Sequence, residues 1–362
     1  MQYRVIGLMS GSSLDGLDIV YVHFEEVAGA WTFEIMETDC IAYSSEWIKK
    51  LSTLSVCSAK EYLLLHSAYG HYLGSCVNHF LEEKKLTYQV QLIASHGHSA
   101  FHLPSLGMTA QLGDGAAIAA TTGIRTISDF RSMDLAFGGQ GAPVVPIGEK
   151  LLFPDFPLFL NIGGIANISA IGDHFVGFDV CPANRILNIL SGNSEKGFDE
   201  NGLIASSGSI NNELLNKLNA FAYYSLPYPK SLSNEFGLQE ILPAIAYENL
   251  SQKDALRTYV QHIVLQISWS LKQIINSFSD KSNLRLLITG GGAHNGFLVD
   301  QLKEELSRYP IQCILPSDHL VDYKEAMVIA LMGILRWREE INVFKSVTGA
   351  SKDSINGALW TV

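Results

Sequence analysis

A turn of small, hydroxylated and acidic residues near the N-terminus offers the first chemistry in the sequence. Residues 6–18 read Ile-Gly-Leu-Met-Ser-Gly-Ser-Ser-Leu-Asp-Gly-Leu-Asp. We predict an apolar strand over residues 3–8 before the turn and a second strand over residues 17–24 after it. No lysine follows the glycines and no helix is predicted there, so the turn is neither a P-loop nor a dinucleotide fingerprint.

The tip of this hairpin carries the groups that bind an anion. Gly11 and Gly16 allow a positive φ and the close approach of a ligand to backbone N–H groups. The hydroxyls of Ser12 and Ser13 add two further donors. A phosphate is the natural ligand of such a tip, and an ordinary hairpin turn is the alternative interpretation.

A similar pattern recurs about half a chain later. Residues 158–169 read Leu-Phe-Leu-Asn-Ile-Gly-Gly-Ile-Ala-Asn-Ile-Ser, so a buried strand again meets a turn, here with Gly163 and Gly164. A short strand follows, and a further strand over residues 175–179 ends on Asp179. Two such units in one chain predict two related domains, each of which opens with a phosphate-facing hairpin.

A third glycine cluster follows a predicted strand over residues 284–289. The turn contains Gly290, Gly291 and Gly292, and a helix is predicted over residues 297–309. The spacing departs from the dinucleotide pattern. A flat glycine surface beside a helix N-terminus is instead suited to an adenine ring or its ribose.

The composition bounds the class of protein. The 362 residues are enough for two domains with full cores, and 47% hydrophobic with 17% charged residues indicate a compact globular chain. A formal net charge of −11 without a run of Lys or Arg argues against a nucleic-acid partner. The five cysteines form no paired motif, which favours a reduced, cytoplasmic setting. The longest apolar run, residues 326–335, is too short to span a bilayer, so no membrane partner is expected.

Predicted strands and helices alternate along the chain, which favours an α/β fold. The proline-containing turn at residues 154–157 indicates a domain boundary, with an N-terminal domain over residues 1–155 and a C-terminal domain over residues 156–339. Residues 340–362 are expected to complete the N-terminal domain. Three long helices are predicted, over residues 60–84, 253–278 and 323–342, and the last carries Lys324 and Glu325 in its first turn.

Several segments together resemble one known family. They are residues 8–16, 128–134, 138–143, 161–169, 290–295 and 324–326. In this order they resemble the superfamily of sugar kinases, actin and heat-shock-chaperone ATPases and, within it, the anhydro-N-acetylmuramic acid kinases. The resemblance implies two duplicated actin-like (ribonuclease H-like) domains with an interdomain nucleotide cleft. It also implies ATP and Mg²⁺ as cofactors and an anhydro amino sugar as substrate.

This family opens the 1,6-anhydro bridge of a cell-wall-derived sugar with water and phosphorylates the freed O6 from ATP. By resemblance, Asp179 would be the general base that activates the water. Asp15 would hold Mg²⁺ through water, and His96, Arg131 and Glu325 would face the sugar. The residues implied on the nucleotide side are Gly11, Ser12, Ser13, Asp15, Gly16, Asp18, Gly163, Gly164, Gly290, Gly291, Gly292 and Asn295.

Three of the acidic candidates have a structural alternative. Asp179 could cap a turn with its side chain, and Asp15 could cap its own hairpin turn. Glu325 could complement the dipole of the helix that it opens.

The histidines after the strand that ends at residue 94 suggest a further alternative. His96, His98 and His102, with Asp114, have a spacing that could ligate zinc. No Cys or Glu-x-x-His context supports zinc, and His96 and His102 have places in the kinase pattern. We therefore favour the kinase interpretation.

The chain departs from the family pattern at three places. Residues 180–184 read Val-Cys-Pro-Ala-Asn in place of Thr-Gly-Pro-Gly-Asn, and residues 96–99 read His-Gly-His-Ser in place of His-Gly-Gln-Thr. Residues 230–235 read Lys-Ser-Leu-Ser-Asn-Glu in place of Lys-Ser-Thr-Gly-Arg-Glu. A kinase for a different anhydrosugar is therefore an alternative, as is a chaperone-like or regulatory ATPase of the same superfamily. The sequence leaves the oligomeric state open, with a homodimer as one candidate.

Overall fold

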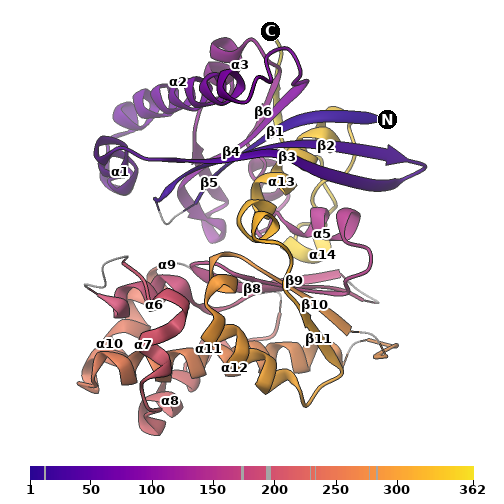
Figure 1. Cartoon of the computed structure of the whole chain (residues 1–362). Helices are drawn as coiled ribbons and strands as arrows, with labels where there is room; N and C mark the ends of the chain where they lie inside the picture. Colours follow the sequence, from indigo (N-terminus) through magenta and orange to yellow (C-terminus); the bar gives the residue numbers. More distant parts are fainter. Residues whose placement is uncertain are drawn as a thin grey trace. The chain divides into compact units, whose positions relative to one another are not determined.

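The computed structural model describes residues 1–11, 14–172, 175–192, 197–228, 230–232, 234–276, 278–282 and 284–362. Ser12 and Ser13, two of the expected phosphate ligands, lie outside the described residues. The chain folds into two compact units, one of Met1–Pro154 with Tyr323–Val362 and the other of Asp155–Asp322. They are called unit 1 and unit 2, and Figure 1 shows the elements of each.

In the described residues of unit 1, seven strands form one sheet with the order β12-β6-β4-β1-β2-β3, and β5 pairs with β4. The central strand β1 (Gln2–Ser10) pairs antiparallel with β2 (Gly16–Val27) and parallel with β4 (Leu92–Leu103). β4 in turn pairs parallel with β6. The other strands are β3 (Ala30–Ala42), β5 (Met108–Leu112), β6 (Thr126–Ser128) and β12 (Ala358–Trp360).

Unit 2 repeats this arrangement. Its described strands form a sheet with the order β11-β10-β7-β8-β9. β7 pairs antiparallel with β8 and parallel with β10, as β1 does with β2 and β4. The strands are β7 (Leu158–Ile162), β8 (Ile165–Ile171), β9 (Phe175–Pro182), β10 (Leu284–Thr289) and β11 (Ile311–Ile314). The predicted duplication of an α/β domain is confirmed, since each unit places a hairpin on one side of its first strand and parallel strands on the other.

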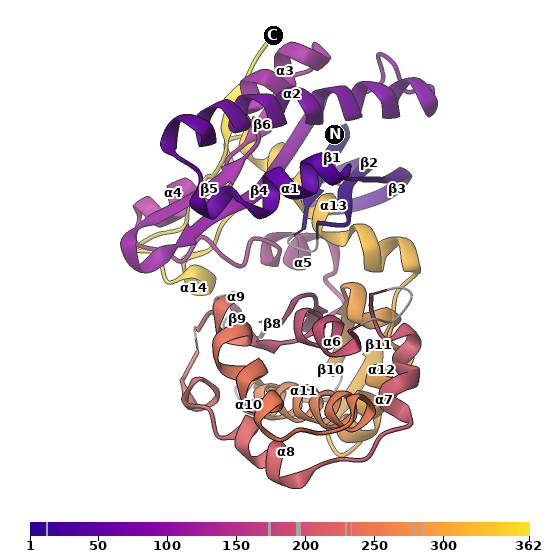
Figure 2. The same ribbon diagram turned by 90° about the vertical axis from the view of Figure 1, so that its left-hand side faces the viewer.

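Helices cover both faces of the unit 1 sheet (Figures 1 and 2). On one face α2 (Ala59–Glu83) buries Tyr69 and Leu73 in a cluster with Ile6 and Leu8 of β1. Its N-terminus is closed by a capping box between Ser58 and Glu61, a common start signal. Apart from α13, which is described below, the other helices of unit 1 are α1 (Ser45–Ser52), η1 (Leu54–Val56), η2 (Pro104–Leu106), α3 (Gly115–Thr122), α4 (Ser132–Ala136), α5 (Pro146–Leu152) and α14 (Lys345–Thr348).

The core of unit 2 is organised by α11 (Gln252–Ile275), close to the predicted range 253–278. Its apolar stripe, which includes Leu256, Val260 and Ile263, is buried against Leu158 and Leu160 of β7. The other helices are α6 (Asn184–Ser191), η3 (Glu200–Gly202), α7 (Leu203–Ser206), α8 (Asn212–Asn219), η4 (Ala222–Ser225), α9 (Asn234–Phe236), η5 (Gly237–Ile241), α10 (Leu242–Tyr247), η6 (Gly291–His294) and α12 (Gly296–Leu306). Among the described residues, none of the helices combines the length and the apolar character that a membrane crossing requires.

The long helix near the C-terminus differs from its prediction. α13 (Asp318–Trp337) begins at residue 318 rather than 323, and unit 1 takes up the chain at residue 323 rather than near 340. A Cβ on Gly7 would lie only 2.0 Å from the Ala326 carbonyl oxygen. Because α13 packs this closely on β1, its residues from 323 onward belong to unit 1, and Gly7 cannot carry a side chain.

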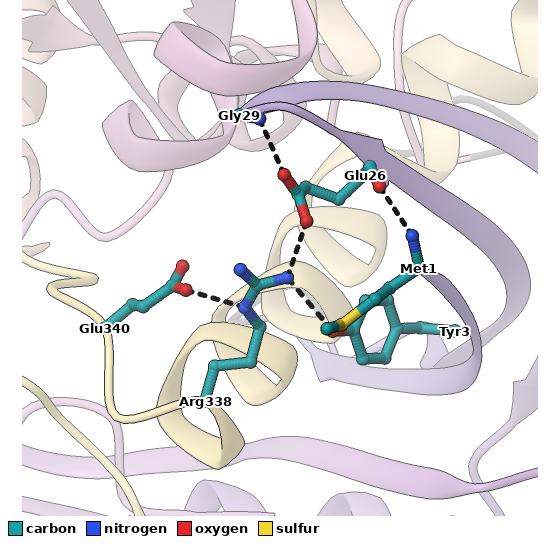
Figure 3. A network of polar contacts seen from close by, with 6 residues as sticks. All are labelled: Met1, Tyr3, Glu26, Gly29, Arg338 and Glu340. Carbon is teal, nitrogen blue, oxygen red and sulfur yellow. Dashed lines mark hydrogen bonds and ion pairs between the residues drawn. The ribbon is translucent and has the colours of Figure 1, made fainter.

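The residue after α13 is tied to the first strands of unit 1 by a polar network (Figure 3). Arg338 Nη1 donates to Tyr3 Oη and to Glu26 Oε2, both at 3.0 Å, and its Nε donates to Glu340 Oε1 at 2.6 Å. Glu26 Oε1 accepts from the Gly29 N–H at 2.6 Å. These bonds, that from Gly29 first and that from Arg338 next, hold the pKa of Glu26 below its ordinary value.

Glu26→Gln is expected to lower thermal stability at neutral pH and to lose this effect in acid. Because the pKa of Glu26 is lower in the folded than in the unfolded chain, its stabilising contribution is present above the unfolded pKa. It is lost as the pH falls through the folded pKa. Thermal unfolding of wild type and variant, from pH 7 down to about pH 3, measures the difference. Glu25→Gln, at the neighbouring exposed position, is the matched control, and the same pH profile for both variants would contradict the assignment.

Candidate active site

The β1–β2 hairpin forms as predicted, but the requirement for Gly16 has a different cause. Its φ lies outside the left-handed region, and a Cβ there would lie 2.8 Å from both Cys40 Sγ and the Ile41 carbonyl oxygen. Glycine is therefore needed at this position because β3 lies close to it. A positive φ of 60° is found at Leu14, a conformation that a branched side chain adopts only when the surrounding structure holds it.

Buried hydroxyl groups support the base of this hairpin. Tyr43 Oη donates to Ser10 Oγ at 2.7 Å and lies 2.6 Å from Tyr69 Oη. Ser10 Oγ lies 2.9 Å from His98 Nδ1. Burial lowers the pKa of His98 to about 4 and raises that of Tyr43 to about 12, so both groups are neutral at pH 7. One of the positions that depart from the family pattern, His98, thus contacts the last residue of β1.

Negative charge collects beside the same hairpin. Asp18 of β2 pairs across the ladder with Cys40 of β3. The pKa of the Cys40 thiol is raised to about 12, first by burial and then by Asp18, with smaller contributions from Asp15 and Asp39. Asp15 Oδ1 also accepts from the Gly16 N–H at 3.0 Å, which is the turn contact of the structural alternative. A cation would be stabilised near these carboxylates.

His96 and Arg131, two expected sugar-side residues, contact each other. Arg131 Nε donates to His96 Nε2 at 2.9 Å, and His96 Nδ1 donates to the Gly97 carbonyl oxygen at 2.9 Å. Burial, and then the charge of Arg131, lower the pKa of His96 to about 3. The ring is therefore neutral, and it orients the guanidinium without adding a second positive charge. Arg131 Nη1 also donates to the Gly141 carbonyl oxygen at 2.7 Å.

The loop that accepts from Arg131 is held by a buried carboxylate, that of Asp134, which is 1% exposed. Asp134 Oδ2 accepts from the Gly141 N–H and Oδ1 from the Thr348 hydroxyl, both at 2.7 Å. The Asp134 N–H donates to Asn356 Oδ1 at 2.9 Å. The C-terminal segment therefore helps to place Arg131 through Asp134 and Gly141.

Glu325 lies on α13, about two turns into the helix rather than in its first turn. The helix-dipole alternative for Glu325 is therefore wrong, because that effect falls off within the first turn. Its neighbour Lys324 pairs with Glu149 of α5 at 2.6 Å, with 2% and 3% of the two side chains exposed. This ion pair joins α13 to α5 at the residue directly before Glu325.

In unit 2, the predicted turn at Gly163 and Gly164 is joined to the start of α6. Its carbonyl oxygens accept from the N–H groups of Asn184 at 3.0 Å and Ala183 at 2.8 Å. Asn184 Nδ2 donates to the Ile162 carbonyl oxygen at 3.0 Å. The nearest atom to a Cβ on Gly163 would be a carbonyl oxygen at 3.4 Å, an ordinary contact, so packing does not require glycine there. The approach of a ligand to the backbone would require it.

The three glycines of the later cluster differ in what they require. Gly290 has a φ of 82°, and a Cβ there would lie 2.4 Å from Asn161 Oδ1. A Cβ on Gly292 would lie 2.3 Å from the Ile162 side chain. Gly291 is exposed, and the nearest atom to a Cβ on it would be 3.6 Å away. Gly290 and Gly292 allow the turn to lie close to β7. Gly291 has no side chain on the outer surface of the turn, which is therefore flat.

Asn295 serves as the N-cap of α12. Its Oδ1 accepts from the Leu298 N–H at 3.0 Å, so the helix begins at Gly296 instead of the predicted residue 297. The Nδ2 group of Asn295 is not used in this cap.

Asp179 lies on β9 and not at the end of the strand, since β9 continues to residue 182. The β8–β9 ladder has a bulge directly after it, because Asn167 pairs with Asp179 whereas Ala166 pairs with Cys181. A bulge bends its strand and redirects the neighbouring side chains. Asp179 Oδ2 accepts from the Leu232 N–H at 2.9 Å. This contact joins segments far apart in the sequence, unlike the turn cap of the structural alternative.

The four residues of the zinc alternative each have another contact. His102 Nδ1 lies 3.0 Å from Thr109 Oγ1, and Asp114 Oδ1 accepts from the Ala116 N–H to cap α3. His96 and His98 have the partners given above. In the part of the chain that the structure describes, no group of three or more His, Cys, Asp or Glu side chains could hold a metal ion.

The duplicated sheets, with glycine-rich turns after parallel strands, define a two-domain α/β fold, and open α/β folds bind their ligands at the carboxyl ends of their strands. The family model of anhydro-N-acetylmuramic acid kinase matches residues 3–362. The chain belongs to this family.

Individual relatives agree. The anhydro-N-acetylmuramic acid kinase of Aliivibrio fischeri is 34% identical over 372 residues, with 99% of each chain covered. That of Shewanella denitrificans is 34% identical over 370 residues, with 98% of each chain covered. That of Haemophilus influenzae is 33% identical over 380 residues, with 98% of this chain and 97% of the relative covered. Because the chain belongs to this kinase family, the alternative of a chaperone-like or regulatory ATPase is not retained.

A solved structure also resembles the chain. It is the activator of the 2-hydroxyisocaproyl-CoA dehydratase from Clostridium difficile with bound ADPNP, at 14% identity over 93% of this chain and 96% of that one. The TM-score of the superposition is 0.45.

The structure brings together some of the expected residues and adds others. His96 contacts Arg131, and the turn at Gly290 closes against β7. Asn184 and Asp134 hold loops in place, although sequence reasoning gave neither a role. Asn184 is the last residue of segment 180–184, which departs from the family pattern, and Asp134 is the last residue of segment 128–134, which matches it. The sequence signal for both was a polar side chain within a segment that had been compared with the family.

Removing one partner of the Lys324–Glu149 pair is expected to destabilise unit 1. Lys324→Met removes the cation that pairs with the buried Glu149 carboxylate, so the free energy of unfolding should fall by about 3–5 kcal/mol, and Lys324→Met/Glu149→Leu should recover most of the loss. Urea unfolding of the three proteins measures both effects. Lys50→Met breaks an exposed pair with Glu46 of the same 2.6 Å length and is the control. It should cost less than about 1 kcal/mol, and an equal cost for both lysines would refute the argument.

Proposed function

We propose that the protein is an ATP-dependent kinase that hydrolyses the 1,6-anhydro bridge of anhydro-N-acetylmuramic acid and phosphorylates O6. The product would be N-acetylmuramic acid 6-phosphate, an intermediate of cell-wall recycling. The observation that carries the proposal is the placement of Asp179, at a bulge and bonded through Oδ2 to Leu232, in a chain of this kinase family. Because ATP is a cytoplasmic metabolite and all five cysteines are unpaired, we place this activity in the cytoplasm.

Asp179 would act as the general base. Its carboxylate takes a proton from water as the water oxygen attacks C1, the bond from C1 to the bridging oxygen breaks, and that oxygen stays on C6. It then attacks the γ-phosphorus of ATP, and ADP leaves. The hydrogen bond from Leu232 keeps one carboxylate oxygen in place, so the proton acceptor needs little reorganisation during the step.

Unit 1 would contribute the hairpin to the nucleotide phosphates. Gly11, Ser12 and Ser13 would bind the phosphates, as the family resemblance implies, while Asp15 and Asp18 would hold Mg²⁺. The fit is reasonable because both carboxylates raise the pKa of the Cys40 thiol, which marks a negative potential beside the hairpin. Mg²⁺ typically binds one or two carboxylates together with substrate phosphates. When bound, the ion would neutralise charge on the transferred phosphoryl group.

Unit 2 would contribute the glycine turns to the nucleotide. Gly163 and Gly164 would contact phosphates through the backbone. The open surface at Gly291, between the close-packed Gly290 and Gly292, would lie against the adenosine, with Asn295 beside it. Two of these glycines are already required by packing, so the ligand contact is proposed chiefly for Gly291.

His96, Arg131 and Glu325 would form the sugar side. Arg131 is suited to the lactyl carboxylate by its planar fork, and neutral His96 fixes the direction of that fork. A kinase for another anhydrosugar is the second candidate, since the departing residue Leu232 lies directly at Asp179.

Asp179→Asn is expected to lower sugar-dependent ADP release by a factor of about 10²–10⁴. ADP release from MgATP with 1,6-anhydro-N-acetylmuramic acid measures it, and phosphorus NMR identifies the 6-phosphate. Asp280→Asn, in an exposed loop of unit 2, is the control and should keep full activity. Wild-type turnover with other anhydrosugars but not with this one would favour the second candidate, and unchanged turnover in Asp179→Asn would remove the base assignment.

Asp15→Asn is expected to raise the Mg²⁺ concentration needed for half-maximal activity, because one ligand charge is lost. Titration of ADP release with Mg²⁺ after removal of metal by a chelator measures it. Asp39→Asn is the control for a general change in electrostatic potential beside the hairpin, because the Asp39 carboxylate also raises the pKa of the Cys40 thiol. If both variants shift the Mg²⁺ requirement equally, Asp15 has no direct role in holding the ion.

A further inference from the structure

A segment of unit 2 that is not part of the sheet forms hydrogen bonds with Asp179 on β9. Its described residues are 223–228 and 230–232, and it is called the 223–232 segment below. β9 is the edge strand of its sheet, so its outer backbone groups are available to this segment.

Three hydrogen bonds join the segment to Asp179. The Asp179 N–H donates to the Lys230 carbonyl oxygen at 3.1 Å. Tyr223 Oη donates to the Asp179 carbonyl oxygen at 2.6 Å. The Leu232 N–H donates to Asp179 Oδ2 at 2.9 Å. Both backbone groups and one carboxylate oxygen of Asp179 are therefore held by the same short stretch of chain.

Lys230 closes the segment on itself. Its Nζ donates to the carbonyl oxygens of Tyr223 at 3.3 Å and Tyr224 at 3.4 Å, and it lies 4.7 Å from the centre of the Tyr223 ring. Burial lowers the pKa of Lys230. The two ends of the segment, which carry Tyr223 and Leu232, are thus connected through one ammonium group.

Tyr223 and Tyr224 are adjacent but point to different partners. Tyr224 Oη lies 3.0 Å from His262 Nε2, and His262 Nδ1 donates to Asn219 Oδ1 at 2.7 Å. Burial lowers the pKa of His262 to about 3, so the ring is neutral and Tyr224 is the donor to it. Burial also raises the pKa of both tyrosines. Each phenol is therefore a neutral donor, and only that of Tyr223 reaches the base.

We propose that Tyr223 is a positioning residue for the reaction, because its hydroxyl holds the bulged main chain from which the Asp179 carboxylate extends. This inference rests on the proposed function, in which Asp179 is the base. Without the phenol, the carbonyl of Asp179 loses its donor and the bulge gains freedom. The carboxylate then spends less time in the geometry that accepts a proton from water.

Tyr223→Phe tests this directly. In ADP release with MgATP and 1,6-anhydro-N-acetylmuramic acid, kcat should fall about tenfold, while KM for each substrate stays within about twofold. The acidic limb of the kcat–pH profile should move to higher pH. The reason is that a weaker Leu232 N–H bond to Oδ2 favours the charged carboxylate less.

Tyr224→Phe is the matched control. It removes a phenol donor from the next residue and leaves His262 Nε2 without it, so thermal stability should fall while kcat and the pH profile stay unchanged. Equal losses of kcat in the two variants would mean that general packing of the segment is responsible, and would overturn the proposal. Wild-type kcat and pH profile in Tyr223→Phe would overturn it as well.

Amide hydrogen exchange separates this proposal from the proposed function, because it needs no turnover. The Leu232 N–H should exchange faster in Tyr223→Phe than in wild type, and at the wild-type rate in Tyr224→Phe. Exchange at the wild-type rate in Tyr223→Phe would overturn the positioning role. Full activity in Asp179→Asn, with faster exchange in Tyr223→Phe, would instead remove the base assignment and leave the structural link intact.

Discussion

Parallel pairing of the first strand of each unit with the next long strand is the constraint on which the candidate site depends. In unit 1 β1, β4 and β6 run in one direction, and in unit 2 β7, β10 and β11 do so. Parallel strands end at the same edge of a sheet, which is where ligands of open α/β folds bind. Ser10 therefore meets His98, and the turn at Gly290 meets Asn161, although each pair is far apart in sequence.

Buried polar groups then fix the side chains that lie at the edge of the sheet where the parallel strands end. Desolvation keeps His96 and His98 neutral, so they act as hydrogen-bond partners within unit 1. Asp134 accepts hydrogen bonds from both Thr348, near the C-terminus, and Gly141, so it links the C-terminal segment to the loop around Gly141. Each of these groups has a partner of matching chemistry, which is the condition under which a buried polar network makes a structure specific.

Glycine is required at different positions of this chain for different physical reasons. Gly7 and Gly16 are needed because a helix and a strand lie against them. Gly290 combines a positive φ with close packing, whereas Gly291 has open space around it. A glycine-rich motif therefore predicts a turn correctly, but the neighbours in space decide which glycine is left for a ligand.

The sequence by itself determined the features that depend on local pattern: the two hairpins, the long helices and the repeat of one α/β plan. It also identified the family, because ordered motifs cover almost the whole chain. Only the tertiary structure decided the start of α13, the burial of Lys324 on Glu149, and the contacts of Asp179 with Tyr223 and Leu232. These depend on segments that meet after distant strands have paired, and neither periodicity nor spacing within one segment carries that information.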